Sequence, residues 1–338
     1  MLSAFITTPF RRSAALRANA DLPLAVGPAI ARTGWPEQDC EESVDCILTL
    51  VAPPGARLDP SLLDSARTAL AVAGVKRIGA GAPFAAGRAA DVDFAGDPWD
   101  PTVADAVRAM LASAPVDYAI QPARPRIKAL LIADMDSTMV ASETLDDMAA
   151  AAGVGERIAA ITKRAMNGEL DFEAALRERV GLLAGMDADI LATTYAGMAM
   201  NPGAEALVAG MRGAGADCRL VSGGFRYFTE RVAERLGFHR QQSNDIGIAD
   251  GKLTGTVLEP ILDGGAKVRA MQAAMTELQI DVAAVAAIGD GSNDIPMLQA
   301  AGLGVAWRGK PAVKAAARAC IDHGDLTTLL LFQRIDSV

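Results

Sequence analysis

The sequence predicts an α/β protein in two parts: a small α+β domain, then a larger parallel sheet into which a block of helices is inserted. Two observations lead to this prediction. From about residue 44, short apolar runs alternate with amphipathic segments in the order β-α-β-β-α-β, up to a proline-bearing stretch at residues 122–125. Beyond that stretch, strand and helix patterns alternate regularly, which is typical of a parallel sheet covered by helices on both faces.

The first part is predicted to span residues 44–121 with a ferredoxin-like plan. Its strands are expected in CILTLVAP, VKRIGAGAP, AADVDFAG and VDYAIQP. Its helices are expected in DPSLLDSARTALAVAG, which Asp59 and Pro60 open, and in PWDPTVADAVRAMLASAP. Residues 1–43 carry arginines and no acid before Asp21, as a transit peptide or a loose N-terminal extension would, and no function is assigned to them.

The second part is predicted to span residues 126–335, with Pro122 and Pro125 in the linker before it. Its strands are expected in IKALLIAD, CRLVSG, AAVAAIGD and LGVAW. Strong helical periodicity between the first two strands predicts a helical cap at about residues 144–202. SNDIGIADGKLTGTVLEP predicts a hairpin that turns at Asp250 and Gly251.

Composition excludes several classes of function. The net charge of −9 provides no basic surface for nucleic acid or an anionic membrane, and no apolar run approaches the ~18–20 residues of a membrane span. We therefore expect a cytoplasmic protein without nucleic-acid or membrane partners. The four cysteines, which form no CxxC pair, are expected to be free thiols: Cys40, Cys46, Cys218 and Cys320. Neither His239 nor His323 has the spacing of a metal ligand or a triad, so catalysis must use carboxylates, lysine or a hard metal ion.

The stretch LLIADMDSTMV ends a buried strand with two acids, Asp134 and Asp136, followed by Thr138. In an extended chain residues i and i+2 face the same way, about 6–7 Å apart, so the two carboxylates would share one space and repel each other. Aspartates also favour turns after strands, which explains the pattern without any function. The groups at the other strand ends decide between the two interpretations.

Ligands of open parallel sheets bind beyond the carboxyl ends of the strands. Polar groups follow two more of the predicted strands: Ser222 and Gly223 follow CRLV, and Asp290, Asn293 and Asp294 follow AAVAAI. Between these two strands, Lys267 opens a predicted helix. Taken singly, these residues are explained by a helix cap, a surface charge and a tight turn. Together they predict a site for a phosphate and a divalent cation, and oxygen ligands suit Mg²⁺ best.

The combination of DMDST, SGG, Lys267 and GDGSND resembles the haloacid dehalogenase superfamily of phosphatases, over about residues 126–335. Within it, the cap and hairpin are most similar to the members that hydrolyse O-phospho-L-serine in serine synthesis. The resemblance implies that Asp134 is the nucleophile, that Asp136 donates and accepts the proton, and that Mg²⁺ binds Asp134, the backbone carbonyl of Asp136, and Asp290. It also implies that Lys267, Ser222 and Gly223 neutralise charge on the transferring phosphoryl group. Asn293 and Asp294 would orient the substrate and the water molecules around the metal, and Thr138 would support the site.

The resemblance also implies a substrate pocket in the cap. Glu143 is expected to receive the substrate ammonium, Arg179 the carboxylate, and Met166 and Phe172 to line the pocket. The periodicity of DFEAALRERVGLLAGM places Arg179 on the apolar stripe of its helix and Arg177 outside it. An arginine that snorkels from a buried face is the alternative explanation for Arg179.

Three alternatives stay open on the sequence: a phosphotransferase that uses homoserine as acceptor, a phosphatase of another small phosphomonoester, and a catalytically inactive amino-acid sensor. A hydrolytic dehalogenase is disfavoured because that branch lacks the second aspartate, and a P-type pump because membrane spans are lacking. The first part is similar to the ACT-type regulatory modules attached to some family members. That similarity implies an amino-acid effector such as L-serine, and an edge strand there would allow a homodimer.

Overall fold

A computed structural model describes residues 45–167 and 169–335 of the chain. The predictions for residues 1–43 and for Cys40 fall outside the described residues. Among the helices of the described ranges, none combines the length and apolarity that crossing a bilayer requires. The described residues belong to one compact unit.

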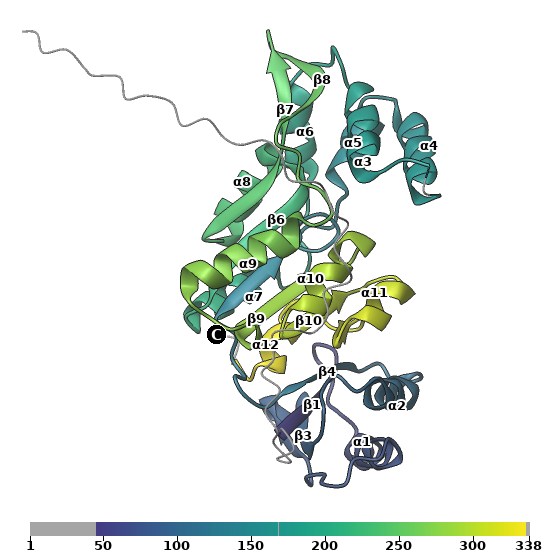
Figure 1. The fold of residues 1–338 in the computed structure, drawn as a ribbon, viewed down its shortest axis with the longest axis vertical. Coiled ribbons are helices and arrows are strands. Elements are labelled where there is room, and N and C mark those ends of the chain that lie inside the picture. The colour runs from purple at the N-terminus through teal and green to yellow at the C-terminus, as the bar shows by residue number, and fades with distance from the viewer. Residues whose placement is uncertain (1–44, 168, 336–338) are drawn as a thin grey trace, which may run out of the picture. The chain divides into compact units, whose positions relative to one another are not determined.

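The first part contains the predicted order of elements (Figure 1): β1 (Asp45–Val51), α1 (Ser61–Val72), β2 (Ala82–Phe84), β3 (Ala89–Ala95), α2 (Pro101–Leu111) and β4 (Asp117–Pro122). The strands are antiparallel in the order β2-β3-β1-β4. The second strand is much shorter than VKRIGAGAP predicts, because glycines interrupt that stretch: only Ile78 makes an isolated bridge to Phe94, and Gly81 has φ +87°. The assignment of residues 44–121 as a separate ACT-type domain stays a prediction.

The second part continues the same sheet. Its strands are β5 (Leu130–Ala133), β6 (Asp217–Phe225), β7 (Arg240–Ala249), β8 (Lys252–Leu258), β9 (Val285–Gly289), β10 (Leu303–Trp307) and β11 (Ala319–Ile321). The full order is β2-β3-β1-β4-β11-β10-β9-β5-β6-β7-β8, in which the strands from β11 to β7 are parallel. No sequence pattern indicated β11, a three-residue strand that pairs antiparallel with β4 and so joins the two parts. The predicted division at residues 121 and 126 is thus crossed by one continuous sheet.

The main sheet is covered on both faces, which explains why its central strand is continuously apolar. Leu131 and Ala133 of β5 pack in one core cluster, with α7 (Ala204–Gly213), α8 (Arg226–Leu236) and α12 (Thr328–Phe332). Leu130 and Ile132 face the other cluster, with α9 (Ala266–Leu278), α10 (Ile295–Ala300) and α11 (Pro311–Ala316). Successive residues of a strand point to opposite faces, so a doubly covered strand needs apolar side chains at every position.

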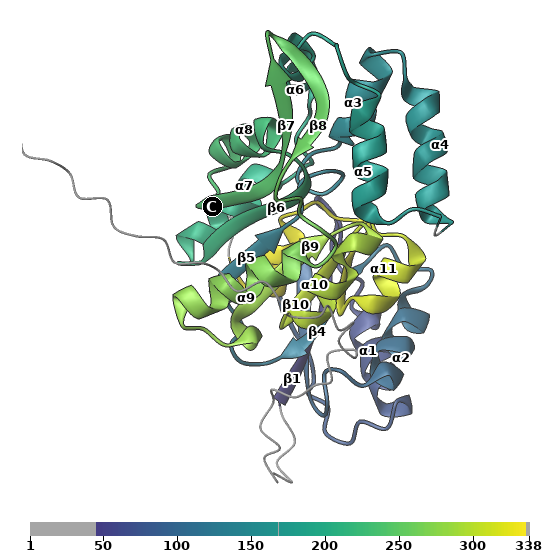
Figure 2. The same cartoon turned by 45° about the horizontal axis from the view of Figure 1, so that its top comes forward.

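The predicted helical cap lies between β5 and β6. It consists of α3 (Thr144–Ala151), α4 (Gly155–Met166), α5 (Phe172–Gly181) and α6 (Asp189–Gly197). Asp171 begins α5 as an N-cap, since its carboxylate accepts a 2.7 Å hydrogen bond from the backbone N–H of Ala174. In Figures 1 and 2, α3, α4 and α5 lie together beside the β7–β8 hairpin.

The hairpin is confirmed, with Asp250 and Gly251 both at positive φ in the turn. It belongs to the main sheet, because the first half of β7 pairs with β6. The hairpin also holds the cap: the backbone N–H of Gly185 donates to the carbonyl of Leu253, and that of Ala188 donates to Gly251, each at 2.8 Å. The cap is therefore anchored to the sheet at the edge opposite the first part of the chain.

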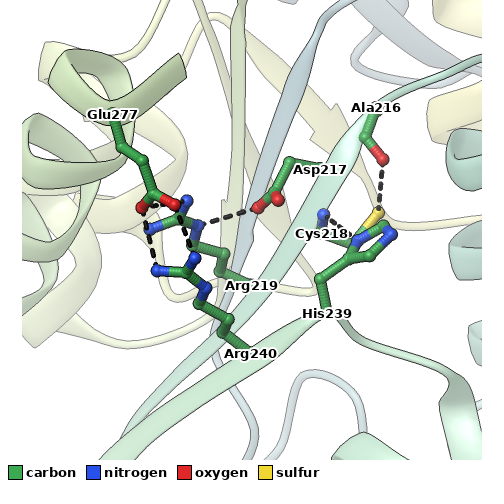
Figure 3. Close-up of polar contacts among 7 residues, drawn as sticks. All are labelled: Ala216, Asp217, Cys218, Arg219, His239, Arg240 and Glu277. Atoms are coloured by element: carbon green, nitrogen blue, oxygen red, sulfur yellow. Dashed lines mark hydrogen bonds and ion pairs between the residues drawn. The ribbon is translucent and has the colours of Figure 1, made fainter.

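An ionic cluster fixes helix α9 across the sheet (Figure 3). At the amino ends of β6 and β7, Arg219 and Arg240 both donate to Glu277 in the last turn of α9, and Arg219 also donates to Asp217 at 2.7 Å. The first turn of the same helix, which carries Lys267, consequently lies at the carboxyl ends of the strands. Glu277, at the amino ends of the strands, thus helps to place Lys267 at their carboxyl ends.

A buried polar network joins the two parts. Asp91 of β3 accepts hydrogen bonds from Thr49 (2.7 Å), Arg126 (2.8 Å) and Arg334 (2.7 Å), and its side chain is only 4% exposed. Arg126 also donates to the carbonyl of Phe332 at 2.7 Å. Because one carboxylate satisfies groups from both parts and from the C-terminal segment, it holds three regions of the chain together.

We expect Asp91→Asn to lower the free energy of unfolding by about 1–2 kcal/mol, because the amide keeps the shape but weakens charge-assisted hydrogen bonds to two arginines. Urea unfolding followed by circular dichroism measures this change. Asp64→Asn is the matched control, since Asp64 pairs with Arg67 on the surface and should leave stability nearly unchanged. Equal effects of the two substitutions would contradict the anchoring role of Asp91.

Candidate active site

The polar groups predicted to meet do so at the carboxyl ends of β9, β5 and β6, which are neighbours in the sheet. Asp134 directly follows β5, and its backbone N–H donates to the carbonyl of Ile288 in β9 at 3.1 Å. Its side chain is buried, at 7% exposure. The chain does not stay extended to Asp136 as the sequence argument assumed: it turns after Met135, whose carbonyl accepts from Thr138 and from Val140, and Ser137 has φ +55°. The turn, not strand alternation, places the second aspartate.

Lys267 lies between two carboxylates. Its ammonium is 2.6 Å from Asp134 and 2.5 Å from Asp294, and all three side chains are at most 7% exposed. Burial lowers the pKa of Lys267, but the two carboxylates outweigh this effect and hold it above its usual range. Burial and the nearby Asp294 raise the pKa of Asp134 well above its ordinary value, although Lys267 opposes the shift. Asp294 is thus an ion-pair partner of the lysine, a closer role than the supporting one predicted for it.

A third carboxylate completes an acidic cluster. Carboxylate oxygens of Asp134, Asp290 and Asp294 all lie within 4.8 Å of one another. Thr138, which is fully buried, donates to Asp290 at 2.9 Å and so fixes its orientation. Burial, with added repulsion from Asp294, raises the pKa of Asp290 to about 6. Hard oxygen ligands at this spacing fit a divalent cation such as Mg²⁺.

Asp136 has different surroundings. One oxygen accepts a 3.0 Å hydrogen bond from the backbone N–H of Thr144 at the start of α3, and the other lies 3.4 Å from the Ser222 hydroxyl. Burial and then the charge of Glu143 raise its pKa to about 7. A carboxyl group with this pKa can both give and take a proton near neutral pH.

Ser222, Gly223 and Gly224, which we call the anion seat, form an irregular stretch of β6. Ser222 accepts a 2.9 Å hydrogen bond from the backbone N–H of Gly224. A Cβ at Gly224 would lie 2.9 Å from a carboxylate oxygen of Asp136, so a side chain at this position would displace the carboxylate. The strand continues to Phe225 and α8 begins only at Arg226, so Ser222 to Gly224 lie at the strand end, before the helix.

Part of the predicted substrate pocket closes over this seat. Phe172, the first residue of α5, lies over Gly223, where an added Cβ would meet its ring at 3.3 Å. One small cavity brings together five predicted residues and three from the segment before α9: Phe172, Ser222, Gly223, Lys267 and Asn293, with Leu262, Asp263 and Gly264. Glu143 and Arg179 are not among the described residues that line it, and the side chain of Met166 lies outside the described part of the chain.

The two arginines of α5 face as the periodicity predicts. Arg179 is half-buried and donates to the carbonyl of Ala175 at 3.2 Å, whereas Arg177 is exposed and pairs with Glu173 and Glu259. Burial lowers the pKa of Arg179, and negative charge on Asp146 and Glu143 opposes this. Glu143 is exposed and accepts a 2.7 Å hydrogen bond from Ser137.

Two buried asparagines behind the site were not predicted from the sequence. Asn201 lies where the chain returns from the cap to the sheet. Its side chain donates to the carbonyls of Thr138 (2.8 Å) and Val140 (3.1 Å) and so stabilises the turn that follows Asp134. Asn244 of β7 contacts the anion seat through Gly223. Neither position carries a motif: Asn201 precedes a Pro-Gly turn, which is ordinary loop chemistry, and Asn244 lies within strand β7, where no local pattern marks it as a site residue.

Comparison with known proteins identifies the class. A family model described as haloacid dehalogenase-like hydrolase matches residues 131–299, a range that contains all the strand-end groups described above. The chain belongs to the haloacid dehalogenase-like hydrolases, as its motifs predicted.

Individual relatives are more specific. Phosphoserine phosphatase SerB2 of Mycobacterium tuberculosis is 41% identical over 205 residues, which cover 61% of the chain but only 50% of that relative. The chain thus spans about half the length of this curated relative. A solved phospho-aspartyl intermediate analogue of phosphoserine phosphatase is 36% identical, with a TM-score of 0.57, and the match covers 61% of the chain and 98% of that structure. A solved haloacid dehalogenase family hydrolase from Salmonella enterica serovar Typhi matches with a TM-score of 0.73 and 28% identity. The match covers 87% of the chain and 100% of that structure.

Proposed function

We propose that the chain hydrolyses O-phospho-L-serine to L-serine and inorganic phosphate, the last step of L-serine biosynthesis, with Mg²⁺ and through an aspartyl-phosphate. The observation that carries this proposal is the contrast between two neighbouring carboxyl groups. Asp134 is ion-paired with Lys267 at 2.6 Å, whereas Asp136 accepts a hydrogen bond from the backbone N–H of Thr144 and lies beside the Ser222 hydroxyl. Two carboxyl groups with such different surroundings are suited to separate roles, one as nucleophile and one as acid and base.

The first half-reaction forms the bond between Asp134 and phosphorus. A carboxylate oxygen of Asp134 attacks phosphorus as the bond to the serine oxygen breaks, and Asp136 gives its proton to that oxygen. Lys267 and the Ser222 hydroxyl stabilise the charge on the transferring group, together with the backbone N–H of Gly223. The nucleophile must be ionised for this step; burial and Asp294 raise the pKa of Asp134 and oppose ionisation, whereas the adjacent Lys267 ammonium favours it.

The second half-reaction restores the enzyme. Asp136, now ionised, takes a proton from water as the water attacks phosphorus, and the bond from phosphorus to Asp134 breaks. Phosphate leaves and both carboxyl groups return to their starting states. The proton that Asp136 lost in the first half is thereby regained in the second.

The donor set fits the proposed cation. Asp134, Asp290 and the backbone carbonyl of Asp136 are the proposed ligands. Among the described residues of the site, three aspartates lie close together and one ammonium group pairs with two of them, so the remaining repulsion favours a bound cation. When bound, Mg²⁺ would supply the positive charge that lets an anionic carboxylate approach an anionic phosphate.

The cap would provide selectivity for phosphoserine. Arg179 is proposed to bind the substrate carboxylate and Glu143 its ammonium, while Phe172 and Met166 line the pocket and Asn293 orients the phosphate. Support comes from the half-buried side chain of Arg179 and from the position of Phe172 over the anion seat. The names of the relatives described above support the same substrate.

The test is phosphate release from a panel of phosphomonoesters with Mg²⁺ or with excess EDTA. We expect turnover to be highest with phosphoserine and to fall to background in EDTA, since oxygen ligands release Mg²⁺ readily to a chelator. Adding homoserine distinguishes hydrolysis from transfer, because a transferase would form phosphohomoserine instead of free phosphate. Preference for another monoester would reassign the substrate, and no turnover at all would favour an inactive sensor. Binding of L-serine to the first part of the chain, and a homodimer formed there, stay predictions that this assay does not address.

A further inference from the structure

Asn244 is a buried side chain whose hydrogen bonds reach two different segments. It is 1% exposed; its amide nitrogen donates to the carbonyl of Gly223 at 2.8 Å, and its amide oxygen accepts from the backbone N–H of Leu262 at 2.7 Å. A carbonyl needs a donor and an N–H needs an acceptor, so the partners define the amide orientation. Aspartate has the same shape but lacks the donor.

The first partner lies in the one irregular stretch between β6 and β7. Val221 pairs with Gln242 and Phe225 with Asn244, so the three residues from 222 to 224 stand opposite the single residue 243. Such a bulge interrupts the ladder of backbone hydrogen bonds. The side chain of Asn244 supplies a hydrogen bond to the carbonyl of Gly223 at this interruption.

The second partner lies in the segment that leads into α9. Leu262 and its neighbours up to residue 264 line the same cavity as Gly223, and Lys267 follows in the first turn of the helix. Asn244 therefore connects the two walls of the cavity from behind. Changing this connection changes the distance between the anion seat and the lysine.

We propose that Asn244 is a positioning residue that sets the spacing between the anion seat at Gly223 and the segment carrying Lys267, so that both walls engage one phosphate together. This inference rests on the proposed function, because it concerns the phosphate of the same site. Asn244 itself is behind the cavity and acts only through the backbone of Gly223 and Leu262. It is expected to govern how phosphate is held and to have no part in recognising the amino-acid portion of the substrate.

The test compares Asn244→Asp and Asn244→Ala with the wild type, using inorganic phosphate as a product inhibitor. We expect the inhibition constant of phosphate to rise, and kcat to fall, by roughly tenfold or more in both variants. The ratio of kcat/KM for phosphoserine to that for phosphoethanolamine should stay unchanged, because the second substrate differs only in lacking the carboxylate. A merely structural role would lower the melting temperature and leave the inhibition constant of phosphate as it is.

Thr229→Val is the matched control. Thr229 is fully buried in α8 and hydrogen-bonds Gln241 and Ser243 of β7, each at 2.8 Å, and none of its hydrogen bonds within the described structure reaches a residue that lines the cavity. The Thr229→Val substitution should lower the melting temperature, while the inhibition constant of phosphate stays at the wild-type value.

Each outcome decides the inference. Wild-type inhibition by phosphate in both Asn244 variants would overturn it, and so would an equal loss of phosphate inhibition in Thr229→Val. A wild type that neither hydrolyses phosphomonoesters nor binds phosphate would overturn the proposed function, and this inference with it. If the variants do not fold, hydrogen exchange of the wild type decides: phosphate should protect residues 222–225 and 262–266 together, and protection of one segment alone would contradict the coupling.

Discussion

Asp134→Asn is expected to abolish turnover, with a loss of roughly a thousandfold or more, above about 4 kcal/mol in the activation free energy. An amide oxygen is a poor nucleophile toward phosphorus, and the substitution also removes the charge that pairs with Lys267 at 2.6 Å. The measurement is steady-state phosphate release from phosphoserine with purified protein. Mass spectrometry must exclude deamidation back to aspartate.

Asp136→Asn tests the role of proton carrier independently of the role of nucleophile. The amide keeps an oxygen that can accept from the N–H of Thr144, but it cannot transfer the proton in either half-reaction. Turnover should again be lost, since both steps require this group. Appreciable hydrolysis by Asp134→Asn would remove Asp134 as nucleophile, whereas activity in Asp136→Asn alone would show that another group carries the proton.

Arg179→Lys and Arg179→Ala are both expected to lower kcat/KM for phosphoserine by about 2 kcal/mol or more. The planar guanidinium can grip a carboxylate at two points, and the lysine ammonium cannot reproduce this although it keeps the charge. Phosphoethanolamine, which has no carboxylate, should lose little in either variant. The comparison of the two substrates therefore measures carboxylate recognition.

Arg177→Ala is the control on the same helix. Arg177 is exposed and pairs only with the surface carboxylates Glu173 and Glu259 among its described ion pairs, so both substrates should be turned over nearly as by the wild type. An equal loss on both substrates in the Arg179 variants would indicate a role in folding or in cap closure. A larger effect from Arg177 would show that the pocket uses the other arginine.

The sequence predicted the elements that have a strong local signal. The aliphatic run before Asp134 could only be a doubly covered strand, and the turn at Asp250 and Gly251 needs positive φ at both positions. The meeting of Ser222 and Asp290 in one site was predicted from the rule that parallel strands present their carboxyl ends at the same side of the sheet. These predictions depend on patterns within a few residues of each other.

What the sequence could not predict depends on contacts between distant segments. Strand β11 has three residues, too few to show a period, and exists because β10 and β4 are available on either side of it. The ion pair of Lys267 with Asp294 joins residues 27 positions apart, and the side-chain contact of Asn201 with Val140 spans 61 positions. Such contacts are set by the fold as a whole, so no local pattern marks the residues that make them.

The pairing of β4 with β11 determines where another chain could add a strand. Because β4 is bonded on both sides, the described sheet has free edges only at β2 and β8. The β2 edge is three residues long and contains Pro83, which has no N–H to donate. Short, proline-bearing edges resist strand addition, so a homodimer formed at the first part of the chain would have to use a surface other than the β2 edge.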